Sequence, residues 1–146
     1  MAHKVFIIDT NVVVAGLLTS QLKSPTAWVL DSMLAGELIY LLSPELLREY
    51  HAVMHRPKLV ALHKRTEAEI EQVLTEITAN AIWREKLDRS QSVSPDLGDQ
   101  HLWDLLACEA NSVLLTGDKP LLQQPPSGRS VISPATLLAW RDASRR

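Results

Sequence analysis

A short apolar run that ends in an acidic residue, near the start of the chain, constrains the fold more than any other feature. The run Val5 to Ile8 is apolar and rich in β-formers, Asp9-Thr10-Asn11 follows it, and a second apolar stretch leads to Gly16. Such a run is typical of a buried strand in a parallel sheet, where chemistry gathers beyond the carboxyl ends of the strands. Asp9 stands at such an end, although from this stretch alone it could equally be only a helix N-cap.

Length and composition indicate one globular domain. The chain has 146 residues, 46% of them hydrophobic and 22% charged, with a net charge of −2 that gives no global sign of nucleic-acid binding. The single cysteine, Cys108, excludes an internal disulfide and a Cys-based zinc site, and it suits a reducing compartment. No stretch approaches the roughly 20 apolar residues that span a bilayer. We therefore expect a cytoplasmic protein without membrane contact, with one domain over 1–140 and a polar tail over 141–146 that frays.

Strand-like and helix-like segments alternate along the chain, which predicts an α/β fold with a mainly parallel sheet. A proline at 57 either ends the third helix or starts another, and 84–98 is expected to be a loop. The expected strands are 5–8, 38–42, 81–83, 113–115 and 129–132, and the expected helices are 11–18, 24–36, 43–55, 66–79, 99–111, 119–123 and a last one from 133 onward.

Acidic residues are expected to meet at one edge of this sheet. Asp9 and Asp118 each follow a strand, and parallel strands end at the same edge. The helix that begins at Asp99 precedes a strand, so its amino end lies at that edge as well. Asp99 falls in line with the apolar positions Trp103, Leu106 and Ala110, which points its carboxylate inward. Asp96 would cap this helix, and a first-turn position for Asp99 is compatible with both capping and metal binding.

Three further polar residues are harder to assign. Asp104 lies about 140° around the helix from Asp99, so we interpret it as a surface acid. Glu49 stands in the middle of a helix whose first turn carries Glu45, and periodicity does not choose between them. His101 could contact a phosphate, but a position on the helix surface is the default expectation for it.

Several carboxylates at one edge repel one another unless a cation relieves the repulsion or some of them take up protons. A set of oxygen ligands with few histidines favours Mg²⁺ or Mn²⁺. Such ions activate water and stabilise a phosphodiester during in-line attack.

Four segments in order resemble the motifs of the PIN-domain family, in particular the VapC-like toxins of bacterial toxin–antitoxin pairs. They are Ile8-Asp9-Thr10-Asn11, the segment from Ser43 to Tyr50 followed by Arg56-Pro57-Lys58, the segment from Asp96 to Leu102, and Leu115-Thr116-Gly117-Asp118-Lys119. The resemblance covers nearly the whole chain, and it selects Glu49 over Glu45. One departure is Asp104, which stands where a small or apolar residue is common and leaves Asp104 open as an alternative to Asp99.

The resemblance implies a metal-dependent endoribonuclease on a three-layer α/β/α sandwich. Asp9, Glu49, Asp99 and Asp118 would be the catalytic residues and would hold Mg²⁺ or Mn²⁺, while Asn11 and Thr116, with Asp96, would support them. The family also implies a homodimer and an antitoxin protein bound in a groove near the first helices. Residues that could line such a groove are Leu17, Trp28, Leu46 and Leu47, although each is individually more typical of the core.

Contact with an RNA substrate requires cations, of which Lys119 lies nearest the expected site and Arg48 follows the second motif. The other candidates are Lys23, His51, Arg56, Lys58, His63, Lys64 and Arg65.

Two other function classes compete with a nuclease. A phosphatase or receiver domain would use Asp9 as a phosphate acceptor, but Asn11 stands where phosphatases of the haloacid dehalogenase type carry a second acid, and Lys4-Val5-Phe6 stands where receiver domains carry theirs. The alternative from another class is a PIN-fold binding module that keeps its acids but acts by docking a protein or RNA partner. Stabilisation by Mn²⁺ would favour a functional metal site over this alternative.

Overall fold

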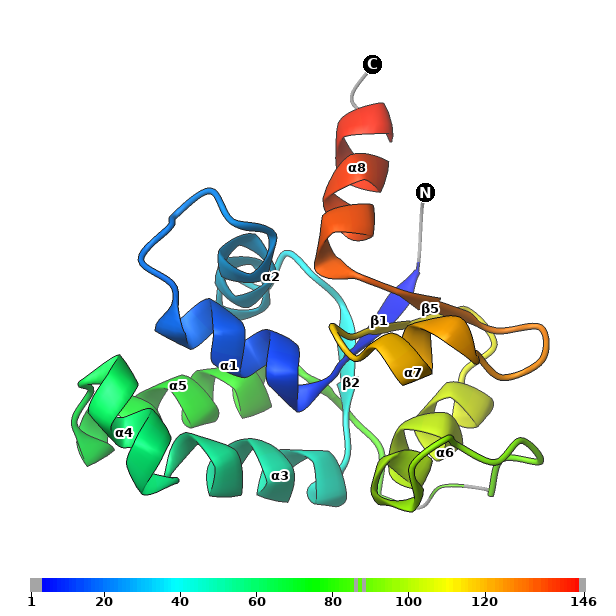
Figure 1. The fold of residues 1–146 in the computed structure, drawn as a ribbon, viewed down its shortest axis with the longest axis horizontal. Helices are drawn as coiled ribbons and strands as arrows, with labels where there is room; N and C mark the ends of the chain where they lie inside the picture. Colours follow the sequence, from blue (N-terminus) through cyan, green and yellow to red (C-terminus); the bar gives the residue numbers. More distant parts are fainter. Residues whose placement is uncertain (1–3, 86, 88, 145–146) are drawn as a thin grey trace.

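The computed structural model describes residues 4–85, 87 and 89–144, and its centre is a parallel five-stranded sheet (Figure 1). The strands lie in the order β3-β2-β1-β4-β5, and every neighbouring pair is parallel. Their bounds are β1 Val5–Ile8, β2 Tyr40–Leu42, β3 Ile82–Trp83, β4 Ser112–Leu115 and β5 Ser130–Ile132. Each expected strand is therefore present.

Helices flank the sheet on both sides and give the expected three-layer α/β/α architecture (Figure 1). Helix α1 packs against α2 and α3, α3 packs against α5 and α6, and α2 packs against α8. The helical segments are α1 Thr10–Leu18, α2 Pro25–Leu34, α3 Pro44–Met54, α4 Pro57–His63, α5 Glu67–Asn80, the 3₁₀ turn Leu97–Asp99, α6 Gln100–Cys108, α7 Lys119–Gln123 and α8 Pro134–Ser144. None of the helices in the described part is long and apolar enough to cross a membrane.

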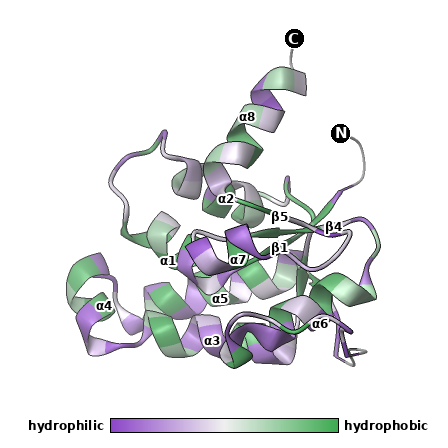
Figure 2. Cartoon of the chain, turned by 45° about the vertical axis from the view of Figure 1, so that its right-hand side comes forward, coloured by the Kyte–Doolittle hydropathy of each residue, from purple (hydrophilic) through white to green (hydrophobic). Residues whose placement is uncertain are grey.

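Strand β1 is the middle of the sheet, and its apolar sequence explains that position. Phe6, Ile7 and Ile8 are buried, and β1 pairs with β2 on one side and with all four residues of β4 on the other. The strands are predominantly hydrophobic, whereas hydrophobic and polar residues alternate along α3 and α4 (Figure 2). Helices cover both faces of such a strand, so neither face is exposed to solvent and its sequence is continuously apolar.

The chain leaves β1 and β4 in opposite directions across the sheet. From β1 it continues to β2, whereas from β4 it continues to β5 on the other side. Between two such strands the connections diverge and leave a crevice at the carboxyl edge. The buried Tyr50 hydroxyl on α3 donates a hydrogen bond of 2.5 Å to the Ile8 carbonyl, which fixes α3 beside this crevice.

Two helices differ from the sequence-based expectation, and a third decides an alternative that the sequence left open. The helix expected over 99–111 is α6, which ends at Cys108, so Ala110 lies outside it and is exposed; the prediction of Ala110 as an inward position was wrong. Pro57 begins a helix of its own. Helix α8 continues through Arg141 to Ser144, because it packs on α2 and the Arg141 guanidinium lies 5.0 Å above the Trp28 ring. Residues 145–146 lie outside the described part.

Gly16 allows α1 and α2 to approach closely. A Cβ atom at this position would lie 2.6 Å from the Thr26 carbonyl oxygen and 2.9 Å from the Leu30 Cβ. Both are nearer than van der Waals contact, and the nearer atom belongs to the backbone. The close approach keeps α1 over the crevice, where its first turn carries Thr10 and Asn11.

We predict that Gly16→Ala destabilises the protein by about 1–3 kcal/mol, because overpacking outweighs the helix propensity of about 1 kcal/mol gained over glycine. Urea denaturation followed by circular dichroism measures the change. Gly98→Ala is the matched control, since a Cβ there would meet only the Asp96 side chain, at 3.3 Å. Equal effects of the two substitutions would contradict this account of the α1–α2 contact.

Candidate active site

A pocket of about 510 Å³ opens at the carboxyl edge of the sheet, beside the crevice between β1 and β4. Carboxylates from four different segments line it: Asp9 after β1, Glu49 on α3, Asp99 before α6 and Asp118 after β4. The remaining lining residues are Thr10, Asn11, Val14, Ala15, Leu18, Val53 and Arg56. The structure thus places the four acids expected from the sequence around one cavity.

Asp9 is 4% exposed, and hydrogen bonds hold both of its carboxylate oxygens. The Thr10 amide donates to Oδ1 at 2.8 Å, so Asp9 is the N-cap of α1 as well as a lining residue. The Thr116 hydroxyl donates to Oδ2 at 2.7 Å, and the Asn11 amide donates to the same oxygen at 3.1 Å. Asp9 can therefore cap α1 and present its carboxylate to the pocket at the same time. Thr116 and Asn11 both hydrogen-bond to this carboxylate, as expected of supporting residues.

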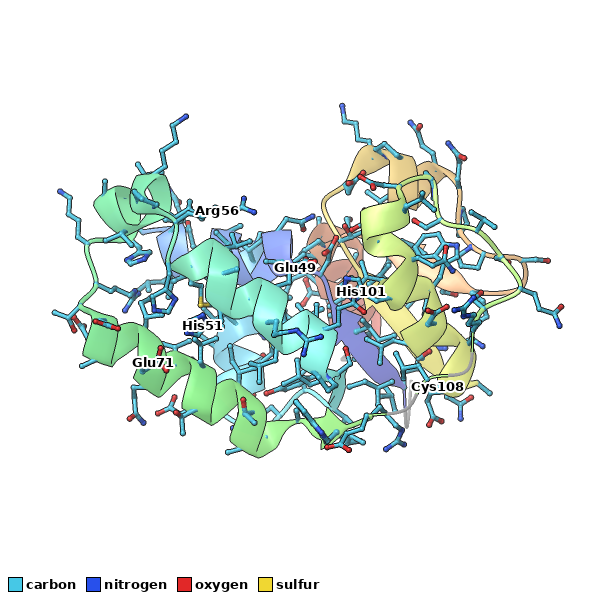
Figure 3. All side chains as sticks on the ribbon, turned by 90° about the horizontal axis from the view of Figure 1, so that it is seen from below. Glu49, His51, Arg56, Glu71, His101 and Cys108 are labelled. Atoms are coloured by element: carbon cyan, nitrogen blue, oxygen red, sulfur yellow. The ribbon has the colours of Figure 1, made fainter. Side chains whose placement is uncertain are left out.

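Glu49 points from α3 toward α6, where it meets His101 (Figure 3). The Thr10 hydroxyl donates a short hydrogen bond to Oε1, and His101 Nε2 lies 3.2 Å from Oε2. The two oxygens thus have different partners, from α1 and from α6. Glu45, the other candidate on α3, is exposed in the first turn and does not line the pocket.

His101 is the residue that the sequence reasoning missed. The expectation of a surface histidine was wrong, because its side chain is 4% exposed and its ring contacts Glu49. Helix α6 is buried over a broader arc than the predicted stripe, an arc that includes Leu102, Leu105 and Leu106. Leu105, four residues beyond His101 on the same side of the helix, was the available signal.

Asp99 and Asp104 have different surroundings. Asp99 ends the 3₁₀ turn and lines the pocket, and Asp96 caps that turn by accepting the Gly98 amide at 2.9 Å. Asp104 lies outside the pocket, where its Oδ1 accepts the Ser90 amide at 2.8 Å and holds the 84–98 loop. This geometry favours Asp99 over Asp104 as the third acid.

The loop after β4 brings Asp118 to the pocket. The Asp118 amide donates to the Thr116 hydroxyl at 3.0 Å, and the Gly117 amide donates to the Asn11 side chain at 3.1 Å. These bonds join the ends of β1 and β4. Asp118 Oδ1 is buried and has no hydrogen-bond partner within the described part of the chain.

The carboxylates disturb one another electrostatically. Burial raises the pKa of Asp9, and the nearby charges of Glu49 and Asp118 add to this against the hydrogen bond from Thr116. Burial also raises the pKa of Asp99 to about 6, with Asp9, Asp96, Glu49 and Asp118 contributing. The hydrogen bond from His101 holds the pKa of Glu49 below its ordinary value. Burial acts to lower the pKa of His101, but Glu49, with the charges of Glu45 and Asp99, raises it overall.

The pocket suits a divalent cation that binds oxygen ligands. Its acids supply only oxygens, their mutual repulsion favours a positive charge, and Asp118 Oδ1 has an unused lone pair. Within the described residues, no three of these acids bring one oxygen each within 4.8 Å of one another. Such a spread set suits an ion that keeps several waters and uses one or two carboxylates, as Mg²⁺ does.

Positive charge at the pocket comes from Arg56, which lines it and acts electrostatically on Glu49. Arg48, expected to contact substrate, is exposed on α3 and does not line the pocket. Lys119 is exposed at the start of α7, next to Asp118. Of the four residues expected to line an antitoxin groove, Leu17 and Leu46 are buried in the core, whereas Trp28 and Leu47 are half-buried.

Comparison with known proteins assigns the family. A family model described as a PIN domain matches residues 5–120, a span that contains β1 to β4 and the four pocket acids. This protein belongs to the PIN-domain family. No curated protein matches the chain. PIN domains are generally nucleases that typically depend on a divalent metal, and the pocket of this PIN domain has donor groups of the corresponding kind.

We predict that Asp99→Asn raises the thermal stability of the metal-free PIN domain at pH 7.5. The raised pKa means that ionisation of Asp99 costs stability, a cost that develops as the pH rises from about 4 to about 6 and is complete above that. The gain should stay below about 1 kcal/mol, because solvent screens this partly exposed group, and should shrink at pH 5. Thermal melts in EDTA measure it.

Asp104→Asn is the matched control for this prediction, because it removes an acid five residues further along the chain, in α6, that lies outside the pocket. It should give no gain in stability. A loss of stability in Asp99→Asn at pH 7.5, or a gain that does not depend on pH, would contradict the electrostatic account of the pocket.

Proposed function

We propose that this PIN domain is a Mg²⁺- or Mn²⁺-dependent endoribonuclease that hydrolyses RNA phosphodiester bonds, and that it is the VapC-like toxin of a toxin–antitoxin pair. One observation carries the nuclease proposal. Four carboxylates from separate segments surround one pocket that also has an arginine on its wall. Carboxylates can hold a hard cation and a guanidinium can bind a phosphate, and both groups serve metal-assisted phosphodiester hydrolysis.

Each carboxylate of the pocket has its own role in holding a divalent ion. Asp9 is held on both oxygens and offers a fixed carboxylate, while Glu49 is oriented by Thr10 and His101. Asp99 and Asp118 complete the donor set from the other segments. A bound divalent ion would supply Lewis-acid stabilisation of the phosphate and lower the pKa of water. Preorganised donors of this kind do not need to reorganise during the reaction.

Arg56 is the residue we assign to the substrate phosphate. It lies on the pocket wall, and its planar guanidinium matches a phosphate group. Lys119 and Arg48, exposed at the start of α7 and on α3, would extend the contact along the RNA backbone outside the pocket. Their charges would strengthen binding without reading sequence.

The toxin assignment rests on the motif resemblance. It entails a cognate antitoxin protein and a homodimer as partners, and residence in the cytoplasm with the RNA. The second candidate is a binding module that docks a protein or RNA partner without cleavage. The mutually repelling acids, of which Asp9 is buried, argue for the nuclease, since a site of this kind costs stability when no cation occupies it.

We predict that the purified protein cleaves RNA with Mg²⁺ or Mn²⁺ and that EDTA abolishes cleavage. Asp9→Asn keeps the size of the side chain but removes its charge, and should lower the rate by about 100-fold or more, since ion binding supplies several kcal/mol in the transition state. Asp99→Asn should be similarly inactive, whereas Asp104→Asn should retain activity. Gel analysis of end-labelled RNA, with DNA of the same sequence alongside, measures this.

The outcomes separate the two candidate functions. Absence of cleavage together with stabilisation by Mn²⁺ would show a metal site whose substrate lies outside the RNAs tested. Absence of both cleavage and stabilisation would overturn the nuclease proposal and leave the binding module.

We also predict that Arg56→Ala raises KM for RNA about tenfold and reduces the salt dependence of binding by about one charge, because one phosphate contact is lost. Arg48→Ala is the matched control, because Arg48 belongs to the same motif segment as Arg56. Its effect on KM should be smaller, because Arg48 lies outside the pocket. Initial rates at several salt concentrations test the pair. Equal effects of the two variants would reject a specific role for Arg56.

A further inference from the structure

A second group of metal-ligating side chains lies between α3 and α5, away from the acidic pocket. His51 lies in the last turn of α3, His55 follows one turn later as the C-cap of that helix, and Glu71 faces them from α5. One ligand atom from each lies within 4.8 Å of the other two. Figure 3 shows His51 and Glu71 together between the two helices, while Glu49 lies on the other side of α3. Two residues along a helix rotate a side chain by about 200°, which separates Glu49 from His51.

Two of the three distances between ligand atoms in this group match a tetrahedral metal site. Glu71 Oε1 is 3.3 Å from His51 Nε2 and 3.5 Å from His55 Nε2. Bonds of about 2.0–2.2 Å from zinc to nitrogen and oxygen place neighbouring ligands of a tetrahedron about 3.3–3.5 Å apart. Histidines at positions i and i+4 of a helix present their rings on one face, which is a common arrangement for binding zinc.

The hydrogen bonding of His55 prepares its ring for a cation. Nδ1 lies 2.7 Å from the His51 carbonyl oxygen, which can only accept, so Nδ1 carries the proton. This leaves Nε2 to face the Glu71 carboxylate, and Nε2 is buried without a hydrogen-bond partner in the described chain. A second hydrogen bond of this kind commonly orients a metal-binding histidine.

A single divalent ion fits this arrangement of side chains. Both histidine Nε2 atoms face one Glu71 oxygen, and the two rings are stacked with centroids 4.2 Å apart. One cation can bind both nitrogens and the carboxylate oxygen at the same time. The contact is also too exposed for ion pairs to contribute much, with the His51 and Glu71 side chains 55% and 52% exposed.

We propose that His51, His55 and Glu71 form a Zn²⁺ site that links α3 to α5. Imidazole nitrogens favour Zn²⁺ over Mg²⁺, so this site and the acidic pocket select different ions. His51 and Glu71 also line a pocket of about 460 Å³, which leaves room for a water molecule at the fourth coordination position. The bound ion stabilises the packing of α3, the helix that carries Glu49.

The test is a calorimetric titration of ZnCl₂ into the full chain at pH 7.5 with Mg²⁺ in excess, which fills the acidic pocket with a hard ion. The wild type should bind one Zn²⁺ and melt at a higher temperature when Zn²⁺ is present. His51→Gln and Glu71→Gln should each weaken binding by tenfold or more, since each removes one of three ligands. Both positions are half exposed, so these variants should fold.

Two matched controls keep the test specific. His63→Gln removes a histidine near the end of α4, and Glu76→Gln removes an exposed acid from α5; neither belongs to the group, and both should bind Zn²⁺ as the wild type does. Binding unchanged in His51→Gln and Glu71→Gln, or no Zn²⁺ binding by the wild type, would overturn the proposal and leave only ion pairs. Binding lost in Asp9→Asn instead would place the ion in the acidic pocket and also overturn it. None of these results depends on nuclease activity.

Discussion

The buried carboxylate of Asp9 is the constraint on which the rest of the site depends. A charge in the interior is costly unless its oxygens have partners, and Asp9 draws them from two distant segments of the chain. Thr10 and Asn11 follow it directly, whereas Thr116 comes from the end of β4, 107 residues away. The hydrogen bonds that satisfy the Asp9 carboxylate hold the start of α1 against the ends of β1 and β4. The same bonds bring Asp118 to the pocket, because its amide is bound to the Thr116 hydroxyl.

The acids of the pocket lower the stability of the fold in order to provide ligands for a cation. Asp9 and Asp99 are both harder to ionise than usual, because burial and neighbouring carboxylates act in the same direction. A protein optimised only for stability would neutralise one of them. The opposite adjustment appears at Glu49, whose charge is favoured by His101. The pocket therefore combines one acid that is readily ionised with two that favour the nearby presence of a cation.

Helix α3 connects the two parts of the molecule that carry ligand groups. One side presents Glu49 to α1 and α6, and the other presents His51, together with the C-cap residue His55, to α5. Its position is fixed from within by Tyr50, whose hydroxyl reaches the last carbonyl of β1. The side chains on the two sides differ in kind, oxygen donors on one and nitrogen donors on the other, so two ions of different chemistry can be bound without competing.

Local patterns in the sequence determined the strands, most helix starts and the acids that follow strands, because burial on both faces and capping leave signals within a few residues. Asp9 and Asp118 could be found in this way, and Asp99 from its place on the inward face. Only the tertiary structure decided the role of His101, the exclusion of Arg48 from the pocket, and the meeting of Glu71 with His51 and His55. These depend on which helices pack together, and a contact between residues far apart in the chain leaves no periodic trace in either segment.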